Sequence, residues 1–409
     1  MKILFVTARV PHSSVAGGHA LVYQRIKRLT ARGHQIGLIS LRRPTDDKLP
    51  DDDLYSILHE YEEVPAPRRP GFIQRPALLL GSRIPPYFWD YRSEQMMRRV
   101  GDLVHASRYD IAVAEFSAMG QYLYQNRYLP AVRKIISCHF SVASAYKSVI
   151  KTKGLSAQGL RSRLSVNKLL TYESGMYRGV DRVIVLTAHE RYMLLNADPT
   201  LRINVIPTGV DADYFRPDDK SNKEHAVVFT GQYEVDSNFD AVKWFVNTTW
   251  PLLKARHPEL KFYIVGPGAR NALEQIARKD PSIIITGGVE DVRPYLHRAK
   301  IYVCPVRLGS GLRFKLFEAM ASGIPVVTTS LGAEGIPLHN GDNCFIGDKP
   351  DIMAQCMGLL LEDESLRQSM ARRARVLMEE RFSWERGIDL LEKVMQDTFG
   401  PHSAPGVGS

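Results

Sequence analysis

Short apolar runs and amphipathic stretches alternate along almost the whole chain. The first run, Lys2–Thr7, has the length and composition of a buried strand. An amphipathic stretch over His19–Arg32 follows it. Gly33 stands directly after this stretch, where helices commonly end in a left-handed residue. A strand followed by a helix and a further strand is typical of a parallel, doubly wound α/β sheet.

The same alternation continues through the first half of the chain and starts again in the second half. In the first half it predicts strands at Gln35–Ser40, Ile111–Ala114, Arg133–Ser137 and Arg182–Leu186. In the second half it predicts strands at Ala226–Thr230, Lys261–Val265, Ser282–Thr286, Ile301–Pro305 and Pro325–Thr329. Helices are predicted there at Phe239–Arg256, Asn271–Lys279, Val292–Ala299, Lys315–Ala321, Pro350–Glu362 and Glu364–Phe382.

A segment broken by proline and glycine, residues 205–217, separates the two series and leads into the charged residues 218–225. We interpret it as a linker, because 409 residues are too many for one ordinary hydrophobic core. The pattern therefore predicts two Rossmann-like domains, residues 1–206 and 207–383. A final helix over residues 384–399 precedes a tail, residues 400–409, that we expect to be disordered.

Composition narrows the class of protein. Hydrophobic residues make up 44% of the chain and charged residues 24%, as in ordinary globular proteins. No stretch approaches the ~18 apolar residues of a membrane-spanning helix, and the first apolar run is too short for the core of a signal peptide. The four cysteines are widely separated, which favours a reducing, cytoplasmic setting without disulfides or a cysteine-based zinc site.

The net charge of +10 is unevenly distributed. Residues 1–210 hold 30 Lys and Arg against 17 Asp and Glu, whereas residues 211–409 hold 24 against 27. This asymmetry predicts an acidic partner for the first half, such as an anionic membrane surface or a lipid-phosphate acceptor. A generally basic proteome would explain the charge equally well. No nucleic-acid-binding motif accompanies it, so we expect no nucleic acid partner.

The segment Gly309–Thr329 carries the strongest chemical signal. It opens with a glycine-rich turn, passes Arg313 and Lys315, and enters an apolar helical stretch with one acid, Glu318. A glycine-rich loop lets the backbone approach a ligand, and a helix N-terminus with basic side chains attracts negative charge. The segment is therefore predicted to bind an anionic group.

With this segment, the chain resembles the GT-B nucleotide-sugar glycosyltransferases, and among them the retaining glycosyltransferase family 4 group. Four stretches carry the resemblance: the Gly17-Gly18 entry with residues 29–36, residues 205–217, residues 227–245, and Gly309–Thr329. The chain looks like the branch of sugar transferases found in exopolysaccharide clusters. The resemblance implies two Rossmann-like domains facing each other across a cleft. It also implies that the first domain binds the acceptor, that the second binds the donor nucleotide, and that the last helix packs back on the first domain.

The resemblance further implies a hexosyltransferase-type activity. A sugar would pass from a UDP- or GDP-linked donor to a hydroxyl of a glycan, glycolipid or lipid-linked saccharide, with retention and without a metal or other cofactor. Such an enzyme would work in the cytoplasm, and the basic first half predicts a peripheral position at the inner face of the plasma membrane.

Arg313 and Lys315 are the cations that we assign to the donor diphosphate, because guanidinium and ammonium groups stabilise a phosphate leaving group. By resemblance, Glu318 accepts hydrogen bonds from the ribose hydroxyls. Many family members carry a second glutamate eight residues before this one. Ser310 stands at that position here.

The departure at Ser310 leaves the donor sugar to other groups. We expect the Ser310 hydroxyl and the backbone of the surrounding loop, Gly309, Gly311 and Leu312, to bind it. The departure also motivates two alternatives, a nucleotide-sugar epimerase and a non-catalytic nucleotide-sugar binder.

Two further groups of candidates are predicted from position. In the first half, Gly17 and Gly18 would let a loop approach the ligand, His139 and Glu115 follow strands, and His12 and His19 are weaker rivals of His139. By resemblance, His139 contacts the donor sugar, and we assign Glu115 to the acceptor side. In the second half, Gly231 would allow close approach to the diphosphate, and Gly288 and Val289 would line the base through backbone groups.

Two motifs are set aside. Asp211 and Asp213 have the spacing of metal-binding carboxylates in other transferases, but their setting indicates turn chemistry. Gly266 and Gly268 follow a strand as in dinucleotide-binding loops, but the third glycine is absent. A nicotinamide-dependent oxidoreductase is therefore the less favoured alternative from another class.

Overall fold

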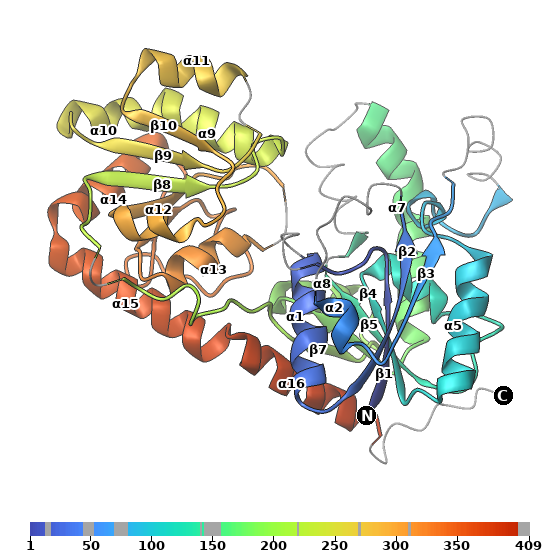
Figure 1. Ribbon diagram of the computed structural model, residues 1–409. Coiled ribbons are helices and arrows are strands. Elements are labelled where there is room, and N and C mark those ends of the chain that lie inside the picture. Colours follow the sequence, from blue (N-terminus) through green and yellow to red (C-terminus); the bar gives the residue numbers. More distant parts are fainter. Residues whose placement is uncertain are drawn as a thin grey trace. The chain divides into compact units, whose positions relative to one another are not determined.

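The computed structural model describes residues 1–12, 18–43, 53–68, 81–139, 141–142, 157–218, 221–268, 271–309 and 312–399, without the side chains of residues 157–165 and 271–272. It divides into two compact units, Met1–Thr208 with Gly387–Ser409, and Gly209–Arg386 (Figure 1). The boundaries predicted from the sequence, after residues 206 and 383, lie close to these divisions. The predicted tail, residues 400–409, lies outside the described residues.

The first unit contains a parallel sheet whose described strands run in the order β3-β2-β1-β4-β5-β6-β7. These strands are β1 (Lys2–Thr7), β2 (Gln35–Arg42), β3 (Glu60–Pro65), β4 (Ile111–Glu115), β5 (Arg133–Cys138), β6 (Arg182–Val185) and β7 (Ile203–Val205). The helices of this unit are α1 (Gly18–Ala31), α2 (Leu54–Ile57), α4 (Pro86–Trp89), α5 (Glu94–Ser107), the 3₁₀ helix η2 (Ser117–Tyr122), α7 (Ala157–Arg178) and α8 (Ala188–Ala197).

Successive residues of β1 point to opposite faces of the sheet, and each face has its own core. Leu4 and Val6 belong to a cluster with side chains of α5 and η2. Ile3 and Phe5 belong to a second cluster, which includes side chains of α1 and of the last helix, α16 (Trp384–Asp397). Both faces of the sheet are therefore covered by helices.

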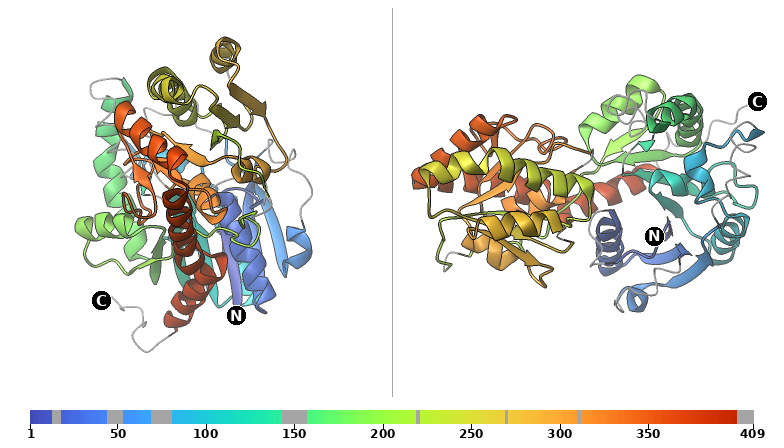
Figure 2. Two further views of the ribbon diagram at one scale, coloured as in Figure 1. Left: turned by 90° about the vertical axis from the view of Figure 1, so that its left-hand side faces the viewer. Right: turned by 90° about the horizontal axis from the view of Figure 1, so that it is seen from above.

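Helix α16 lies beside α1 in the first unit, as the red and blue helices of Figure 2 show. Its Ile388 and Leu391 are buried in the cluster that contains β1 and α1. Arg32, just after α1, contacts both Asp389 and Glu392 at 2.7 Å. The C-terminal segment thus adds a helix to the core of the first unit.

The second unit contains a parallel sheet in the order β10-β9-β8-β11-β12-β13 among its described strands. The strands are β8 (Ala226–Thr230), β9 (Lys261–Val265), β10 (Ile283–Gly287), β11 (Ile301–Cys304), β12 (Val326–Thr328) and β13 (Phe345–Ile346). Its helices are α9 (Asp236–Thr248), α10 (Trp250–Arg256), α11 (Asn271–Lys279), α12 (Arg293–Arg298), α13 (Phe314–Ala321), α14 (Pro350–Glu362) and α15 (Glu364–Arg381). Helices α9 and α10 cover one face, and α12 and α13 cover the other (Figure 1), as right-handed crossovers in opposite directions require.

In each sheet the strand order reverses beside the first strand of the unit. The reversal falls between β1 and β4 in the first unit and between β8 and β11 in the second. Open α/β sheets bind ligands beyond the carboxyl ends of their strands at such a reversal. The fold therefore marks two places where functional side chains should collect.

The observed elements differ from the predicted ones in two ways. The single helix predicted over Phe239–Arg256 is wrong, because α9 and α10 meet at Thr249. Pro251 lacks the amide hydrogen that an unbroken helix would need there. Strands β3, β7 and β13 were not predicted. All three are edge strands, which are shorter or more polar than the central ones.

Candidate functional site

Two predicted residues meet at the carboxyl end of the first unit's sheet. Glu115 is the last residue of β4, and His139 follows β5 directly. The imidazole Nε2 of His139 lies 2.7 Å from Oε2 of Glu115. Arg25 of α1 donates from Nη1 to Oε1 of the same carboxylate at 3.0 Å and to Ser137 Oγ at 2.7 Å. All of these side chains are buried, so the cation, carboxylate and imidazole form one connected network.

The environment of this network fixes its charges. Burial alone would raise the pKa of Glu115, but the Arg25 guanidinium and the hydrogen bond from His139 hold that pKa at about 2. Burial lowers the pKa of His139, against the opposing effect of Glu115. A carboxylate accepts hydrogen bonds only, so the proton of the neutral imidazole resides on Nε2. Nδ1 is then an acceptor, and no described residue donates to it.

Close packing confines His139. Phe116 stacks on its ring, with centroids 4.0 Å apart, and has a φ of 71°, a strained value for a residue with a side chain. A Cβ on Gly18 would lie 2.6 Å from the Phe116 ring and 2.7 Å from His139 Nδ1. Glycine at position 18 is therefore required by this packing. Gly17, its predicted companion, lies outside the described residues.

Sequence analysis missed Arg25. It lies one helical turn from both Leu21 and Leu29 on the buried face of α1. A lone cation within an apolar stripe needs a buried partner. The position of Arg25 within this apolar stripe is therefore the sequence feature that could have identified it. His12 is also buried, and the ring of His19 lies 5.2 Å from that of Phe116.

Lys315 is the central cation of the second unit's site. It lies at the start of α13, and its Nζ donates to Asn238 Oδ1 at 2.7 Å. The same ammonium lies 4.4 Å from the centroid of the buried Phe229 ring. A Cβ on Gly231, directly after β8, would lie 2.9 Å from Nζ. Lys315 thus reaches the end of β8 because residue 231 has no side chain.

Arg313 occupies the N-cap position of α13, and its side chain makes no capping hydrogen bond. Its Nη2 donates to the Leu308 carbonyl at 3.3 Å. Gly309 has a φ of 90°, and a Cβ there would lie 3.6 Å from Nη2. Ser310 and Gly311, both predicted to bind the donor, lie outside the described residues.

Burial changes the titration of all three charged groups on this segment. Desolvation lowers the pKa of Lys315 to about 8 and also lowers that of Arg313. Desolvation raises the pKa of Glu318 to about 7, against the opposing charge of Lys315. Each charged form is disfavoured without a ligand, as expected of groups held ready for a charged or polar partner.

The remaining predicted residues occupy the rim of the second unit's sheet. Gly288 is exposed and follows β10, and the partly buried Val289 and Leu312 pack against the core. Asp211 accepts a hydrogen bond from the Tyr214 amide at 2.9 Å, as turn chemistry predicts. A Cβ on Gly266 would lie 2.0 Å from the Gly231 carbonyl oxygen. This glycine therefore serves packing between two strand ends.

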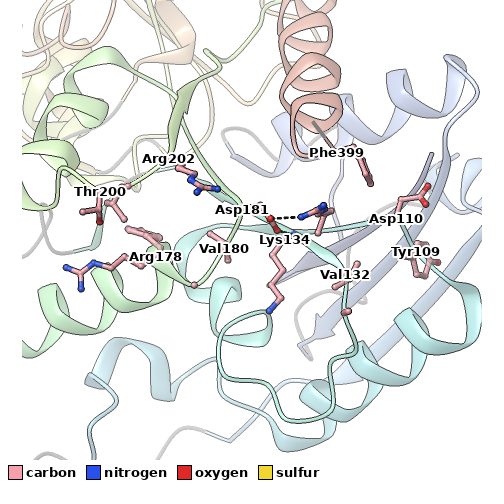
Figure 3. Close-up of a pocket in the computed structure, with 15 residues that line it drawn as sticks. Tyr109, Asp110, Val132, Lys134, Arg178, Val180, Asp181, Thr200, Arg202 and Phe399 are labelled. Atoms are coloured by element: carbon pink, nitrogen blue, oxygen red, sulfur yellow. Dashed lines mark hydrogen bonds and ion pairs between the residues drawn. The ribbon is translucent and has the colours of Figure 1, made fainter. Parts of the chain in front are cut away.

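A pocket of about 950 Å³ lies at the amino ends of the first unit's strands, where β4, β5 and β6 begin, away from Glu115 and His139 at the carboxyl ends (Figure 3). Arg133 in its wall pairs with Asp181 at 3.4 Å. Lys134 and Arg178 point away from each other in Figure 3, so their charges do not converge on one centre. None of the predicted site residues lines this pocket.

Among the described residues, no helix is both long and apolar enough to span a membrane.

Two family models match the chain in sequence. Residues 15–214 match Glycosyltransferase Family 4, and residues 224–363 match Glycosyl transferases group 1. The two matches are separated by nine residues and together include every predicted site residue except His12, one of the weaker rivals of His139.

The chain is also similar to individual proteins of other organisms. The chain is 21% identical over 366 residues to an uncharacterized 44.6 kDa protein in the cps region of Klebsiella pneumoniae, covering 87% of this chain and 89% of that protein. It is 32% identical over 178 residues to a phosphatidyl-myo-inositol mannosyltransferase of Mycolicibacterium smegmatis, covering 41% and 45%. It is 26% identical over 271 residues to an N-acetyl-alpha-D-glucosaminyl L-malate synthase of Bacillus anthracis, covering 63% and 69%.

Solved structures show the same fold. A sucrose-phosphate synthase from Thermosynechococcus elongatus superposes with a TM-score of 0.71 at 16% identity, covering 98% of this chain and 99% of that one. HepE of Anabaena, in complex with UDP and glucose, superposes with a TM-score of 0.68 at 14% identity, covering 97% and 100%. The two family matches together cover most of the chain and show that it belongs to the glycosyltransferases with a family 4 domain and a group 1 domain, and the solved structures show that it has the GT-B fold.

Proposed function

We propose that this glycosyltransferase moves a hexose from a nucleoside-diphosphate donor to a hydroxyl acceptor, with retention and without a metal. The observation that carries the proposal is the position of Lys315. Its desolvated ammonium reaches the end of β8, at the reversal of the second sheet. A diphosphate bound there would restore the stabilisation that the ammonium loses on burial. HepE, a structural neighbour, binds UDP and glucose.

Each candidate side chain has a role that follows from its charge and hydrogen-bonding capacity. Arg313 and Lys315 stabilise negative charge on the departing diphosphate, and the N-terminal amides of α13 add a partial positive charge. Glu318, three residues after Lys315 on the same helix, accepts hydrogen bonds from ribose hydroxyls. In the first unit, Nδ1 of His139 accepts a hydrogen bond from a sugar hydroxyl, once the atoms that bury Nδ1 move aside. Glu115, fully buried, acts through His139 as a positioning residue instead of touching the acceptor itself.

In the proposed reaction, the bond between the anomeric carbon and the diphosphate oxygen breaks while the acceptor oxygen bonds to the same face of that carbon. The proton of the acceptor hydroxyl passes to the departing phosphate oxygen. No carboxylate nucleophile is required, and the cations of α13 carry the charge of the leaving group.

The test is to incubate the purified protein with UDP- and GDP-linked hexoses and candidate acceptors. Release of nucleoside diphosphate should depend on the acceptor, and the anomeric configuration of the product should match that of the donor. Epimerised sugar without release would support the epimerase alternative. Nucleotide-sugar binding without release would support the non-catalytic binder. Absence of any nucleoside diphosphate binding would contradict all three.

We further propose that the first unit meets an anionic membrane surface on the cytoplasmic side. The support is the excess of 30 basic over 17 acidic residues in residues 1–210. Co-sedimentation with anionic liposomes should exceed that with neutral ones and should fall with added salt. Equal binding to both kinds of vesicle would contradict this proposal.

A further inference from the structure

Two imidazoles and a carboxylate lie together in the second unit, at the amino ends of strands β8 and β9. His225 directly precedes β8, His257 ends α10, and Glu259 lies in the turn before β9. One ligand atom from each of the three lies within 4.8 Å of the other two. The cluster is at the opposite end of the strands from Gly231 and Lys315, so it is separate from the candidate donor site.

One ring nitrogen of each imidazole lacks a hydrogen-bond partner among the described residues. Nε2 of His225 and Nε2 of His257 are both buried, and neither is hydrogen-bonded to any residue that the structure describes. His225 Nε2 is 3.2 Å from Glu259 Oε1, close enough for an ion pair but without hydrogen-bond geometry. A buried polar atom without a partner costs about 1–3 kcal/mol and calls for an explanation. A bound cation would satisfy both nitrogens together.

The backbone holds these side chains in place. The carbonyl of His225 accepts from the Lys261 amide at 3.0 Å, within the pairing of β8 with β9. The amide of His257 donates to the Leu253 carbonyl at 2.8 Å, and its carbonyl accepts from the Leu260 amide at 3.0 Å. The backbone positions of both histidines are therefore set by a sheet and a helix end.

A fourth candidate ligand atom, the second oxygen, lies beside His257 but outside the group of three whose ligand atoms are all within 4.8 Å of one another. Oε1 of Glu362, the last residue of α14, lies 3.6 Å from His257 Nε2. Lys300 and Arg367, on other elements, lie close enough to His225 to act on it electrostatically. These two cations would also repel a metal ion. The carboxylates of Glu259 and Glu362 supply two compensating negative charges.

We propose that His225, His257, Glu259 and Glu362 bind a divalent transition-metal ion of the zinc type. Two nitrogen and two oxygen donors suit Zn²⁺ better than Mg²⁺ or Ca²⁺, which prefer oxygen alone. The ion would connect the entry to β8, the turn between α10 and β9, and the end of α14. Its role would be structural, because it would lie at the end of the sheet away from the residues proposed to bind the donor.

The test is a titration of the full-length protein, free of affinity tag and stripped with a chelator, with Zn²⁺ and separately with Co²⁺. We expect one equivalent of Zn²⁺ to bind, a rise in the melting temperature, and Co²⁺ absorption bands typical of four-coordinate nitrogen and oxygen ligands. His225→Ala and His257→Ala should each weaken binding at least tenfold. His339→Ala, at an exposed histidine of the same unit, is the matched control and should bind as the wild type does.

Glu259→Gln and Glu362→Gln keep the test valid if an imidazole variant fails to fold, because both carboxylates are largely exposed. Each should weaken Zn²⁺ binding while the metal-free protein keeps its melting temperature. The proposal is overturned if the wild type binds no stoichiometric Zn²⁺. It is equally overturned if binding persists unchanged in both histidine variants, or in both glutamine variants where the histidine variants do not fold. No enzymatic activity enters these measurements, so their outcome is independent of the proposed reaction.

Discussion

The imidazole of His139 and the carboxylate of Glu115 are joined by a 2.7 Å hydrogen bond in the buried end of the first unit's sheet. The bond determines which nitrogen of the imidazole carries the proton. Since Glu115 is also paired with Arg25, its negative charge is retained without water. The residue pair therefore fixes Nδ1 of His139 as a hydrogen-bond acceptor, and this atom is buried.

The Arg25–Glu115 pair should show strong coupling in stability. Arg25→Met or Glu115→Gln alone should lower the free energy of unfolding by about 3–5 kcal/mol, because each leaves a buried charge unpaired. The double variant should lose much less than the sum of the two single losses. Urea denaturation at pH 7 measures this. Strictly additive losses would refute the coupling. As a control, the same double-mutant cycle on the partly exposed pair Arg99–Glu62 should give a coupling energy of only about 0–1 kcal/mol.

Replacement of His139 should separate nucleotide binding from sugar handling. His139→Ala should lower kcat/KM by roughly 10–100-fold, the effect of losing about 1–3 kcal/mol of hydrogen bonding. Affinity for the nucleoside diphosphate alone should not change, because that ligand lacks the sugar. Steady-state kinetics and calorimetric titration test the two statements. A parallel loss of nucleoside diphosphate affinity would show that the residue serves another purpose.

The central strands and the placement of the main candidates at strand ends could be predicted from the sequence, because periodicity and glycine positions report them directly. The edge strands could not, since β3 carries Glu60, Glu62 and Glu63 and lacks the apolar signal of a buried strand. The pairing of Glu115 with His139 joins two strands that are neighbours only in the folded sheet. No spacing along the chain encodes it. The burial of Lys315 against Phe229 depends in the same way on a contact between distant segments.

Nucleoside diphosphate affinity should depend on the charge of Lys315. With a pKa of about 8 in the ligand-free protein, its ammonium is roughly nine-tenths protonated at pH 7 and one-tenth at pH 9. If the diphosphate binds the protonated form, affinity should fall about tenfold over this range. Lys315→Arg keeps its charge and should give a flatter profile. A wild-type affinity that does not change from pH 7 to pH 9 would contradict the role of this ammonium.

Glu318→Gln should stabilise the fold above neutral pH and weaken nucleotide binding. The folded pKa of Glu318, about 7, exceeds its ordinary value of 4.5, so folding becomes less favourable as the pH rises from 4.5 through 7. Glutamine cannot ionise, and the variant should therefore gain stability over the wild type at pH 8 but not at pH 4.5. Urea denaturation at both pH values measures the difference. An equal difference at the two pH values would show that Glu318 is not desolvated in the folded protein.

The same variant should bind UDP more weakly, while its affinity for 2′-deoxy-UDP should change less, because a carboxylate accepts the ribose hydroxyls better than an amide does. Calorimetric titration with both nucleotides makes the comparison. Equal losses for the two ligands would place Glu318 away from the 2′-hydroxyl.

The central claim is that Arg313 and Lys315 hold the donor diphosphate, and calorimetric titration with UDP and GDP at pH 7 tests it most directly. Arg313→Ala and Lys315→Met should each reduce nucleoside diphosphate affinity at least tenfold without lowering the melting temperature. Lys243→Met, at an exposed lysine of α9, should leave affinity unchanged. Wild-type affinity for both nucleotides in the Arg313→Ala and Lys315→Met variants would contradict the account.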